Sequence, residues 1–285
     1  MAQHWNVGDT TITSVVEVEL PVPGEVFIEG ASGPAVQSHD WLVPHFATPD
    51  GLLLVRIQLL VIESGGKRIA VDTCLGNDKE RTNPAFHRLQ TPFLQTFTDA
   101  GFDRDNIDVV VCTHLHTDHV GWNTMLVDGV WVPTFPNARY VFGADELRYW
   151  ESHRDAQHDG DLYADSIEPV LRADLADIVA LPYAITDEIR LVSTPGHTPG
   201  HMSVEIASGD ARAIITGDVL HHPVQCAEPE WASTFDSDRA MAASTRRTLL
   251  SAAADTETLV IGTHFAGPGA GYVRSHDDTW RFVAG

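Results

Sequence analysis

The sequence predicts a layered α/β domain, because short β-rich runs alternate with helical segments in two rough halves of the chain. The composition agrees: of 285 residues, 43% are hydrophobic and 20% are charged, which suits a protein with a sizeable core. No linker, low-complexity stretch or short-period repeat divides the chain. We therefore expect a single domain over residues 1–285.

The first half of the chain predicts strands, an irregular arm and one helix. Its β-rich runs are residues 11–20, 52–63, 67–72 and 107–112. Gly65 and Gly66 predict a hairpin turn between the second and third of these. The last is short and mostly apolar, which is typical of a strand buried on both faces. Residues 93–100 predict a helix that ends at Gly101. Residues 1–50 hold the first strand and then the arm, which is rich in proline, glycine and aromatic residues.

In the second half of the chain the expected strands and helices alternate more regularly. The expected strands are residues 139–142, 188–193, 203–207, 211–216 and 258–261, the last of these being the final strand. The expected helices are residues 145–153, 167–175 and 238–254. This order favours a sheet-containing domain with helices on its faces.

The charge balance disfavours some partners. Lys and Arg number 18 against 40 Asp and Glu, a formal net charge of −22, which suits neither nucleic acid nor an anionic membrane surface. The longest apolar run, residues 52–62, contains Arg56 and Gln58, so no segment is expected to span a bilayer. We therefore expect a small-molecule substrate and neither a nucleic acid nor a membrane as partner.

The cellular setting is predicted from the cysteines and the N-terminus. The first residues lack a basic flank followed by an apolar stretch, so a secretory signal is not expected. The cysteines are odd in number and far apart, as in proteins of a reducing compartment: Cys74, Cys112 and Cys226. We expect a cytoplasmic protein, with Cys112 as a small core residue.

The segment Thr113-His114-Leu115-His116-Thr117-Asp118-His119 directly follows the strand expected at residues 107–112. In extended chain His114 and His116 point to the same side, because they are two residues apart. The chain then turns within the loop, so Asp118 and His119 can face a different position from that faced by the two histidines. Imidazole and carboxylate donors suit borderline divalent metals, above all zinc. The segment therefore predicts a metal site.

Three further donors follow other expected strands: His197, Asp218 and His264. Each has a glycine within two residues, which lets the backbone approach closely. Loops after strands are where α/β folds place ligand-binding residues. Each residue alone is more often an ordinary loop residue, but together with the first cluster they predict a two-metal centre.

This series of residues resembles the metallo-β-lactamase superfamily from Asp72-Thr73 to His264. The resemblance implies an αββα sandwich, in which helices flank two mixed β-sheets and the site lies at one edge between the sheets. It implies one metal bound by His114, His116 and His197, and a second bound by Asp118, His119 and His264. Asp218 would bridge both metals. Asp72 would support the ligands, and we expect His201 to pack or support rather than bind metal.

The implied cofactors are two Zn²⁺ ions, although manganese, iron or cobalt suits the same donors. Two dications lying close together need anionic bridges, which a carboxylate and a hydroxide provide. The bridging hydroxide would be the nucleophile. Asp118 is also a candidate to shuttle a proton.

Within the superfamily the chain is most similar to the group of acyl-homoserine-lactone lactonases and methyl-parathion-hydrolase-like enzymes. It lacks the cysteine that common antibiotic-hydrolysing members carry where Asp218 stands, and we expect none of the additional domains that mark the glyoxalase II, nucleic-acid-processing and flavin-linked branches. It departs from the best-known lactonases at His221, where they carry a tyrosine three residues after the bridging aspartate. His221 is therefore a catalytic candidate as a hydrogen-bond donor to the substrate. The alternative is that His221 or His222 only orients a ligand or packs at the rim.

Several aromatic side chains are candidates for an apolar substrate pocket: Phe27, Trp41, Phe46, Trp122, Trp131 and Trp150. The alternative for most of them is an ordinary core position or a contact in a homodimer, which is a further expectation. Trp122 is the strongest candidate, because it follows His119 by three residues. The sequence thus predicts a dinuclear hydrolase of a small ester, lactone or organophosphate. A metal-dependent binding or sensor protein on the same fold is the alternative.

Overall fold

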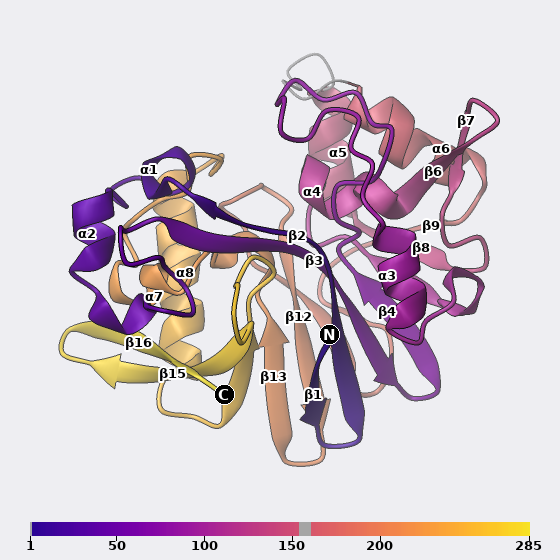
Figure 1. Ribbon diagram of the computed structural model, residues 1–285. Coiled ribbons are helices and arrows are strands. Elements are labelled where there is room, and N and C mark those ends of the chain that lie inside the picture. Colours follow the sequence, from indigo (N-terminus) through magenta and orange to yellow (C-terminus); the bar gives the residue numbers. More distant parts are fainter. Residues whose placement is uncertain (1, 154–160) are drawn as a thin grey trace.

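The computed structural model describes residues 2–153 and 161–285. Within these residues two seven-stranded sheets lie face to face, and helices cover their outer sides (Figure 1). Both sheets are mixed, since parallel pairs such as β4–β5 and β13–β14 stand among antiparallel ones. This arrangement confirms the predicted αββα sandwich. Single-domain organisation over residues 1–285 stays a prediction.

The first sheet has the strand order β1-β2-β3-β4-β5-β8-β9. Its strands are β1 (Gln3–Val7), β2 (Thr10–Val22), β3 (Leu53–Ser64), β4 (Lys67–Val71), β5 (Val109–Val111), β8 (Arg139–Gly143) and β9 (Ala176–Val179). The hairpin expected at Gly65 and Gly66 is confirmed, because Ser64 pairs with Lys67 across these glycines. Strand β5 is shorter than predicted, and Cys112 lies just beyond it in the core, 1% exposed.

The second sheet runs from β10 to β16 in chain order. Its strands are β10 (Tyr183–Ala184), β11 (Ile189–Ser193), β12 (Met202–Ser208), β13 (Ala211–Ile215), β14 (Thr258–Ile261), β15 (Ala270–His276) and β16 (Thr279–Ala284). The expectation that residues 258–261 form the final strand was wrong, because the antiparallel pair β15–β16 extends the sheet beyond β14. A separate hairpin joins β6 (Thr124–Val127) to β7 (Val130–Pro133).

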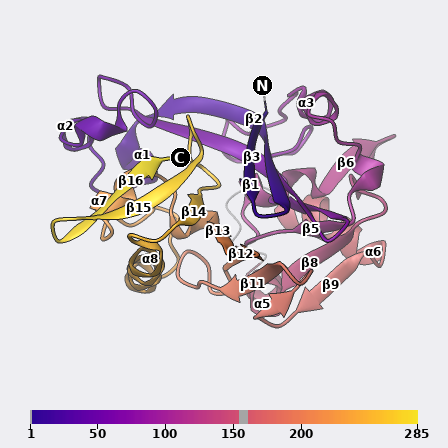
Figure 2. The same cartoon turned by 90° about the horizontal axis from the view of Figure 1, so that it is seen from below.

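The helices lie on both outer sides of the sandwich (Figures 1 and 2). They are α1 (Gly24–Phe27), α2 (Gly33–Gln37), α3 (Phe93–Asp99), α4 (Thr117–Val120), α5 (Ala144–Ser152), α6 (Glu168–Arg172), α7 (Val224–Ala227) and α8 (Arg239–Ala253). Helix α6 is shorter than the predicted helix over 167–175, because it ends at Arg172, just before Asp174 takes a left-handed φ of 56°; a π-helical turn over Tyr163–Ile167 precedes it. The arm is less irregular than expected, since it contains α1 and α2. Among the described residues no helix is long and apolar enough to cross a membrane.

Apolar side chains along a strand alternate between the space between the two sheets and the helix-covered outer side. Val109 and Val111 pack between the two sheets, whereas Val110 between them packs against the helix-covered side of the first sheet. Strand β5 is therefore buried on both faces, as its composition predicts. A third cluster joins the arm, α8 and the second sheet. These layers fix the ends of β5, β11, β13 and β14, where the candidate site lies.

Candidate metal centre

The seven predicted ligands converge at the carboxyl ends of four strands from both sheets. The loop after β5 carries His114 and His116 and continues into α4, whose first turn holds Asp118 and His119. The other ligands follow β11, β13 and β14, respectively: His197, Asp218 and His264. Helix α4 lies at the upper edge of the sheets in Figure 1. The structure thus brings together residues that lie up to 150 positions apart, as His114 and His264 do.

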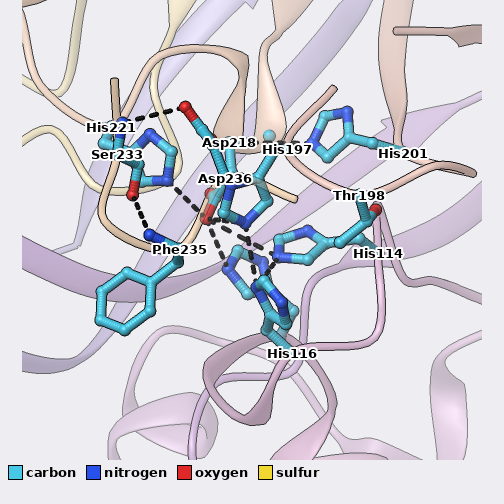
Figure 3. Close-up of polar contacts among 12 residues, drawn as sticks. His114, His116, His197, Thr198, His201, Asp218, His221, Ser233, Phe235 and Asp236 are labelled. Atoms are coloured by element: carbon cyan, nitrogen blue, oxygen red, sulfur yellow. Dashed lines mark hydrogen bonds and ion pairs between the residues drawn. The ribbon is translucent and has the colours of Figure 1, made fainter. Parts of the chain in front are cut away.

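The first group consists of His114, His116, His197 and Asp218. His116 Nδ1 lies 3.0 Å from His114 Nε2 and 2.9 Å from His197 Nε2. Asp218 Oδ2 lies 3.3 Å from His197 Nε2. Figure 3 shows these side chains pointing toward one another. Three imidazole nitrogens and one carboxylate oxygen around one point are a usual zinc ligand set.

The second group consists of Asp118, His119 and His264. Asp118 Oδ1 lies 3.7 Å from His119 Nε2, and its Oδ2 lies 3.5 Å from His264 Nε2. Asp218 faces this group too, because its Oδ1 lies 3.2 Å from His264 Nε2 and its Oδ2 3.5 Å from His119 Nε2. The Asp218 carboxylate therefore stands between the two groups, where the resemblance placed a bridging ligand.

The electrostatics of the first group suit metal ligands. Burial lowers the pKa of His114, His116 and His197 well below the ordinary value of 6.5. Their imidazoles are therefore neutral at physiological pH. A neutral imidazole keeps a lone pair for a metal ion, which a protonated one lacks.

The second group shows the opposite shift, because negative charge surrounds it. Burial is the largest influence and opposes the charged form of His119 and His264, but the surrounding carboxylates together outweigh it and raise the pKa of both: Asp218 and Asp118 act on each, and Asp72 also acts on His119. In turn, burial disfavours the charged form of Asp218, but His119 and His264 hold the pKa of that carboxyl well below its ordinary value. This end of the site requires positive charge, which a bound cation supplies in place of the protons.

Orphaned polar atoms at the site also fit metal ions. Among the described residues, four atoms of the ligand side chains are buried without a hydrogen-bond partner: both ring nitrogens of His119, Asp218 Oδ1 and His264 Nε2. Buried polar groups left without a partner are costly and require an explanation. Of these atoms, His264 Nε2 lies 3.2 Å from Asp218 Oδ1, and His119 Nε2 lies 3.5 Å from Asp218 Oδ2, so both imidazoles face the same carboxylate. The residues present therefore fit two divalent cations.

The remaining ring nitrogens of the ligands are held by specific partners, which fixes their orientation. His119 Nδ1 lies 3.0 Å from Asp72 Oδ2, and Asp72 Oδ1 accepts a hydrogen bond from the Thr113 amide at 2.7 Å. His264 Nδ1 lies 2.8 Å from the Arg56 carbonyl oxygen, and His197 Nδ1 lies 2.8 Å from Asp236 Oδ1. The structure thus places Asp72 behind a ligand, as expected, whereas no pattern in the sequence predicts the same position for Asp236.

His201 also lies behind the ligands. Its Nε2 accepts a hydrogen bond from the Asp218 amide at 2.9 Å, and its Nδ1 lies 2.9 Å from Thr194 Oγ1. Gly217 makes this contact possible, because a Cβ there would lie 2.6 Å from His201 Nε2. Both ring nitrogens are thus engaged, as expected of a residue that packs or supports.

The neighbours His221 and His222 differ in their surroundings. His221 Nε2 lies 3.2 Å from Asp218 Oδ2, and both of its ring nitrogens are buried without a hydrogen-bond partner. His222, by contrast, donates from Nε2 to the Phe46 carbonyl at 2.7 Å and accepts at Nδ1 from the Val224 amide at 3.1 Å. His221 therefore belongs to the site, whereas His222 is a structural residue.

The aromatic pocket candidates lie in different places. Phe27 faces the site, with its ring centroid 5.3 Å from that of His221 and 6.0 Å from that of His264. Trp150 also reaches it, 5.4 Å from the His116 ring. The others do not contact the ligands: Phe46 packs on His222 and Phe282, Trp41 lies near Arg281 and His39, and Trp131 lies under Lys79.

Trp122 was the strongest candidate for the pocket, and the structure places it in the core instead. It is 3% exposed and stacks on Phe93, with ring centroids 5.5 Å apart. Its Nε1 donates to Glu17 Oε1 at 2.8 Å. Proximity to His119 in sequence does not bring its ring to the site, because the ring packs in the core against Phe93.

The His222 contacts predict a pH-dependent stability. Burial lowers the pKa of His222 from 6.5 to about 4. Between these values the unfolded chain binds a proton that folded His222 does not. Its stabilising contribution is therefore complete above pH 6.5 and is lost as the pH falls toward 4. Between pH 7 and pH 5 this loss amounts to about 2 kcal/mol.

The measurement is the free energy of unfolding in urea for chelator-treated protein at both pH values. In His222→Gln, which has no titrating ring, the difference between pH 7 and pH 5 is expected to be smaller by about 2 kcal/mol. If the free energy of unfolding depended on pH equally in both proteins, the lowered pKa of His222 would not contribute to stability as proposed.

Comparison with known proteins identifies the family. Residues 57–264, more than half of the chain, match the metallo-β-lactamase superfamily. The chain therefore belongs to this superfamily, as the resemblance implied.

Two relatives illustrate the relationship. An N-acyl homoserine lactonase of Bacillus sp is 26% identical over 171 residues, which cover 56% of this chain and 61% of the relative. The probable metallo-hydrolase Rv2300c of Mycobacterium tuberculosis is 28% identical over 204 residues, 67% of this chain and 65% of the relative. The chain thus spans less than two thirds of the length of these relatives.

Solved structures show the same fold. The hydrolase AbOPH of the β-lactamase superfamily has a TM-score of 0.80 at 24% identity and covers 99% of this chain and 96% of its own. AidC, a dizinc quorum-quenching lactonase solved with a product, has a TM-score of 0.77 at 19% identity. The match covers 100% of this chain and 97% of the AidC chain. At these identities the likeness establishes the fold.

Proposed function

We propose that the protein is a dinuclear metal-dependent hydrolase of small esters, lactones or organophosphates. The observation that carries this proposal is the position of the Asp218 carboxylate, 3.3 Å from His197 of the first group and 3.2 Å from His264 of the second. A carboxylate shared by two neighbouring ligand groups suits two cations that act together.

Zinc suits this donor set best, because imidazole nitrogen and carboxylate oxygen are its usual ligands; manganese, iron and cobalt are the alternatives. When bound, two such cations would supply a hydroxide nucleophile at neutral pH and would offset negative charge on the substrate oxygen. The second ring nitrogens of His119, His197 and His264 contact Asp72, Asp236 and the Arg56 carbonyl, respectively. These contacts would hold the ligand rings in place for this chemistry.

Two side chains have proposed roles beyond ligation. His221 Nε2 would donate a hydrogen bond to the substrate oxygen that gains charge. Asp118 would accept and release a proton at a carboxylate oxygen, because its side chain is 21% exposed where that of Asp218 is 4% exposed. The more accessible carboxylate is the one that can exchange protons with substrate and solvent.

The surroundings favour a substrate with an apolar part. Phe27 lies against His221 and His264, and Phe235 lies beyond it with ring centroids 6.3 Å apart. Phe235 is 56% exposed and Val26 is 67% exposed, so apolar surface continues outward from the site. Relatives named N-acyl homoserine lactonase make lactones the first class to test. A cytoplasmic location and a homodimer stay predictions from the sequence.

A metal-dependent binding or sensor protein is the alternative function. Turnover of a panel of chromogenic esters, lactones and phosphotriesters separates the two. A hydrolase loses this turnover with a chelator and regains it with added zinc, whereas a binding protein turns over none of the panel. The same panel ranks the three substrate classes.

The proposal predicts that the purified protein binds two equivalents of a divalent transition metal. Seven candidate ligands in two groups, with orphaned nitrogens in the second, support two cations. Elemental analysis of protein reconstituted with zinc measures this. At most one equivalent after reconstitution would exclude the dinuclear site.

A further inference from the structure

One buried carboxylate holds together the two loops that carry the first ligand group. Glu146, in the first turn of α5, is 1% exposed. Its Oε1 accepts hydrogen bonds from the Leu115 amide at 3.0 Å and from Trp150 Nε1 at 2.7 Å. Its Oε2 accepts from Thr198 Oγ1 at 2.7 Å and from the Gly200 amide at 3.1 Å. Four donors from three segments thus meet on this side chain.

These donors stand next to the ligands in the chain. Leu115 lies between His114 and His116, and Thr198 directly follows His197. The Trp150 ring, which Glu146 also orients, lies 5.4 Å from the ring of His116. Because Oε1 holds one loop and Oε2 holds the other, the carboxylate fixes the distance between the two loops.

The backbone packing supports the same relationship independently. A Cβ at Gly200 would lie 2.1 Å from the Glu146 amide nitrogen. The loop of residues 194–201 therefore rests directly on the first turn of α5, and only glycine permits this approach. Helix α5 is a fixed support, because Leu147 on its next position is 3% exposed in the core.

The second ligand group depends on other residues. His119 is held by Asp72 and His264 by the Arg56 carbonyl, both from the first sheet or its β4 end. Glu146 makes no hydrogen bond to either residue, nor to the segments on each side of His264. Asp118 and His119 follow Leu115 in the same loop, but their stretch is held separately, because the Thr73 amide donates to the His119 carbonyl and the Gly121 amide to the Cys74 carbonyl, both at 2.7 Å. A disturbance at Glu146 should therefore reach the first group and spare the second.

We propose that Glu146 is a positioning residue that sets the spacing of His114 and His116 against His197, and so controls the metal affinity of the first group alone. This inference rests on the proposed two-metal site. In Glu146→Gln an amide NH₂ replaces one oxygen and faces hydrogen-bond donors, so one loop loses its partner. Loss of such an outer contact weakens metal binding by roughly 10- to 100-fold.

The test measures Zn²⁺ affinity by calorimetry on chelator-treated protein in two backgrounds. His264→Ala removes a ligand of the second group and leaves the first intact, whereas His116→Ala does the reverse. In the His264→Ala background, Glu146→Gln is expected to weaken binding by roughly 10- to 100-fold. In the His116→Ala background the affinity is expected to stay unchanged.

Glu17→Gln is the matched control. Glu17 is also a carboxylate that accepts from an amide, an indole and a hydroxyl: Leu75, Trp122 and Thr91. It contacts neither loop of the first group, so it is expected to leave the His264→Ala affinity unchanged. Thr198→Val removes one hydrogen bond to Glu146, keeps the side-chain shape and should weaken the first group by roughly 3- to 10-fold. It keeps the test decisive if Glu146→Gln does not fold.

Equal weakening in both backgrounds, or no weakening in the His264→Ala background, would overturn the positioning role. The proposed function fails separately, since it requires two zinc equivalents in the otherwise unchanged protein. One equivalent there, with an effect of Glu146→Gln still confined to the His264→Ala background, would reject the dinuclear site and keep the positioning role.

Discussion

Asp218→Asn is expected to lower hydrolytic activity by roughly a thousandfold or more, which corresponds to about 4 kcal/mol of transition-state stabilisation. The substitution keeps the size of the side chain and removes its negative charge. That charge is shared by the two groups, since Asp218 lies 3.3 Å from His197 and 3.2 Å from His264. Without it the mutual repulsion of two cations is no longer offset, so metal content should fall as well. Asp218→Ala should act in the same direction.

The measurements are the kcat/KM for the best substrate of the panel and the zinc content after reconstitution. Asp210→Asn is a suitable control, because it also removes one negative charge, from the exposed turn between β12 and β13. The control should keep both metals and its activity. An Asp218→Asn enzyme that retained most of its activity and both metals would show that this carboxylate is not a shared ligand.

The convergence of the candidate ligands could be predicted from the sequence because its signals are local. His114, His116, Asp118 and His119 fall within six residues, directly after a strand whose apolar composition is easily recognised. The remaining ligands each follow a strand too, and the ends of neighbouring strands meet at one edge of a sheet. The structure brings all seven together for this reason.

The residues that orient the ligands could not be predicted in this way. Asp236 and Glu146 are two among 40 acidic residues, and nothing near them in sequence indicates a special role. Their partners lie far along the chain: His197 is 39 residues from Asp236, and Gly200 is 54 residues from Glu146. Such contacts depend on how loops pack across the edge of the sandwich, which periodicity does not describe.

One missed element did have a signal in the sequence. Asp128-Gly129 lies between the apolar stretches of β6 and β7, and this dipeptide is a strong indicator of a two-residue hairpin. Both residues have positive φ, 49° and 80°, as that turn requires. The prediction that Trp122 lines the substrate pocket was wrong because it relied on a sequence distance alone. Its distance from His119 in sequence suggested the pocket, but burial of its large ring against Phe93 decided its position.

His221→Ala is expected to lower turnover by roughly 10- to 1000-fold while both metals stay bound, as loss of one donor to a developing oxyanion does elsewhere. His221 is 1% exposed and lies 3.2 Å from Asp218, and neither ring nitrogen has a hydrogen-bond partner. An imidazole in this place can donate one N–H to the substrate. His221→Tyr should then regain part of the activity toward lactones, because a phenol hydroxyl is a donor of similar reach.

His222→Gln is the matched control for this experiment, because His222 is the neighbouring histidine and its ring nitrogens are already engaged by Phe46 and Val224. It should lower stability and leave kcat unchanged. Steady-state kinetics and zinc content of the three variants give the answer. Unchanged turnover in His221→Ala would exclude the donor role. Loss of metal in that variant would instead make His221 a residue that holds the ligands, since its imidazole lies 3.2 Å from Asp218 and its ring centroid 4.7 Å from that of His197.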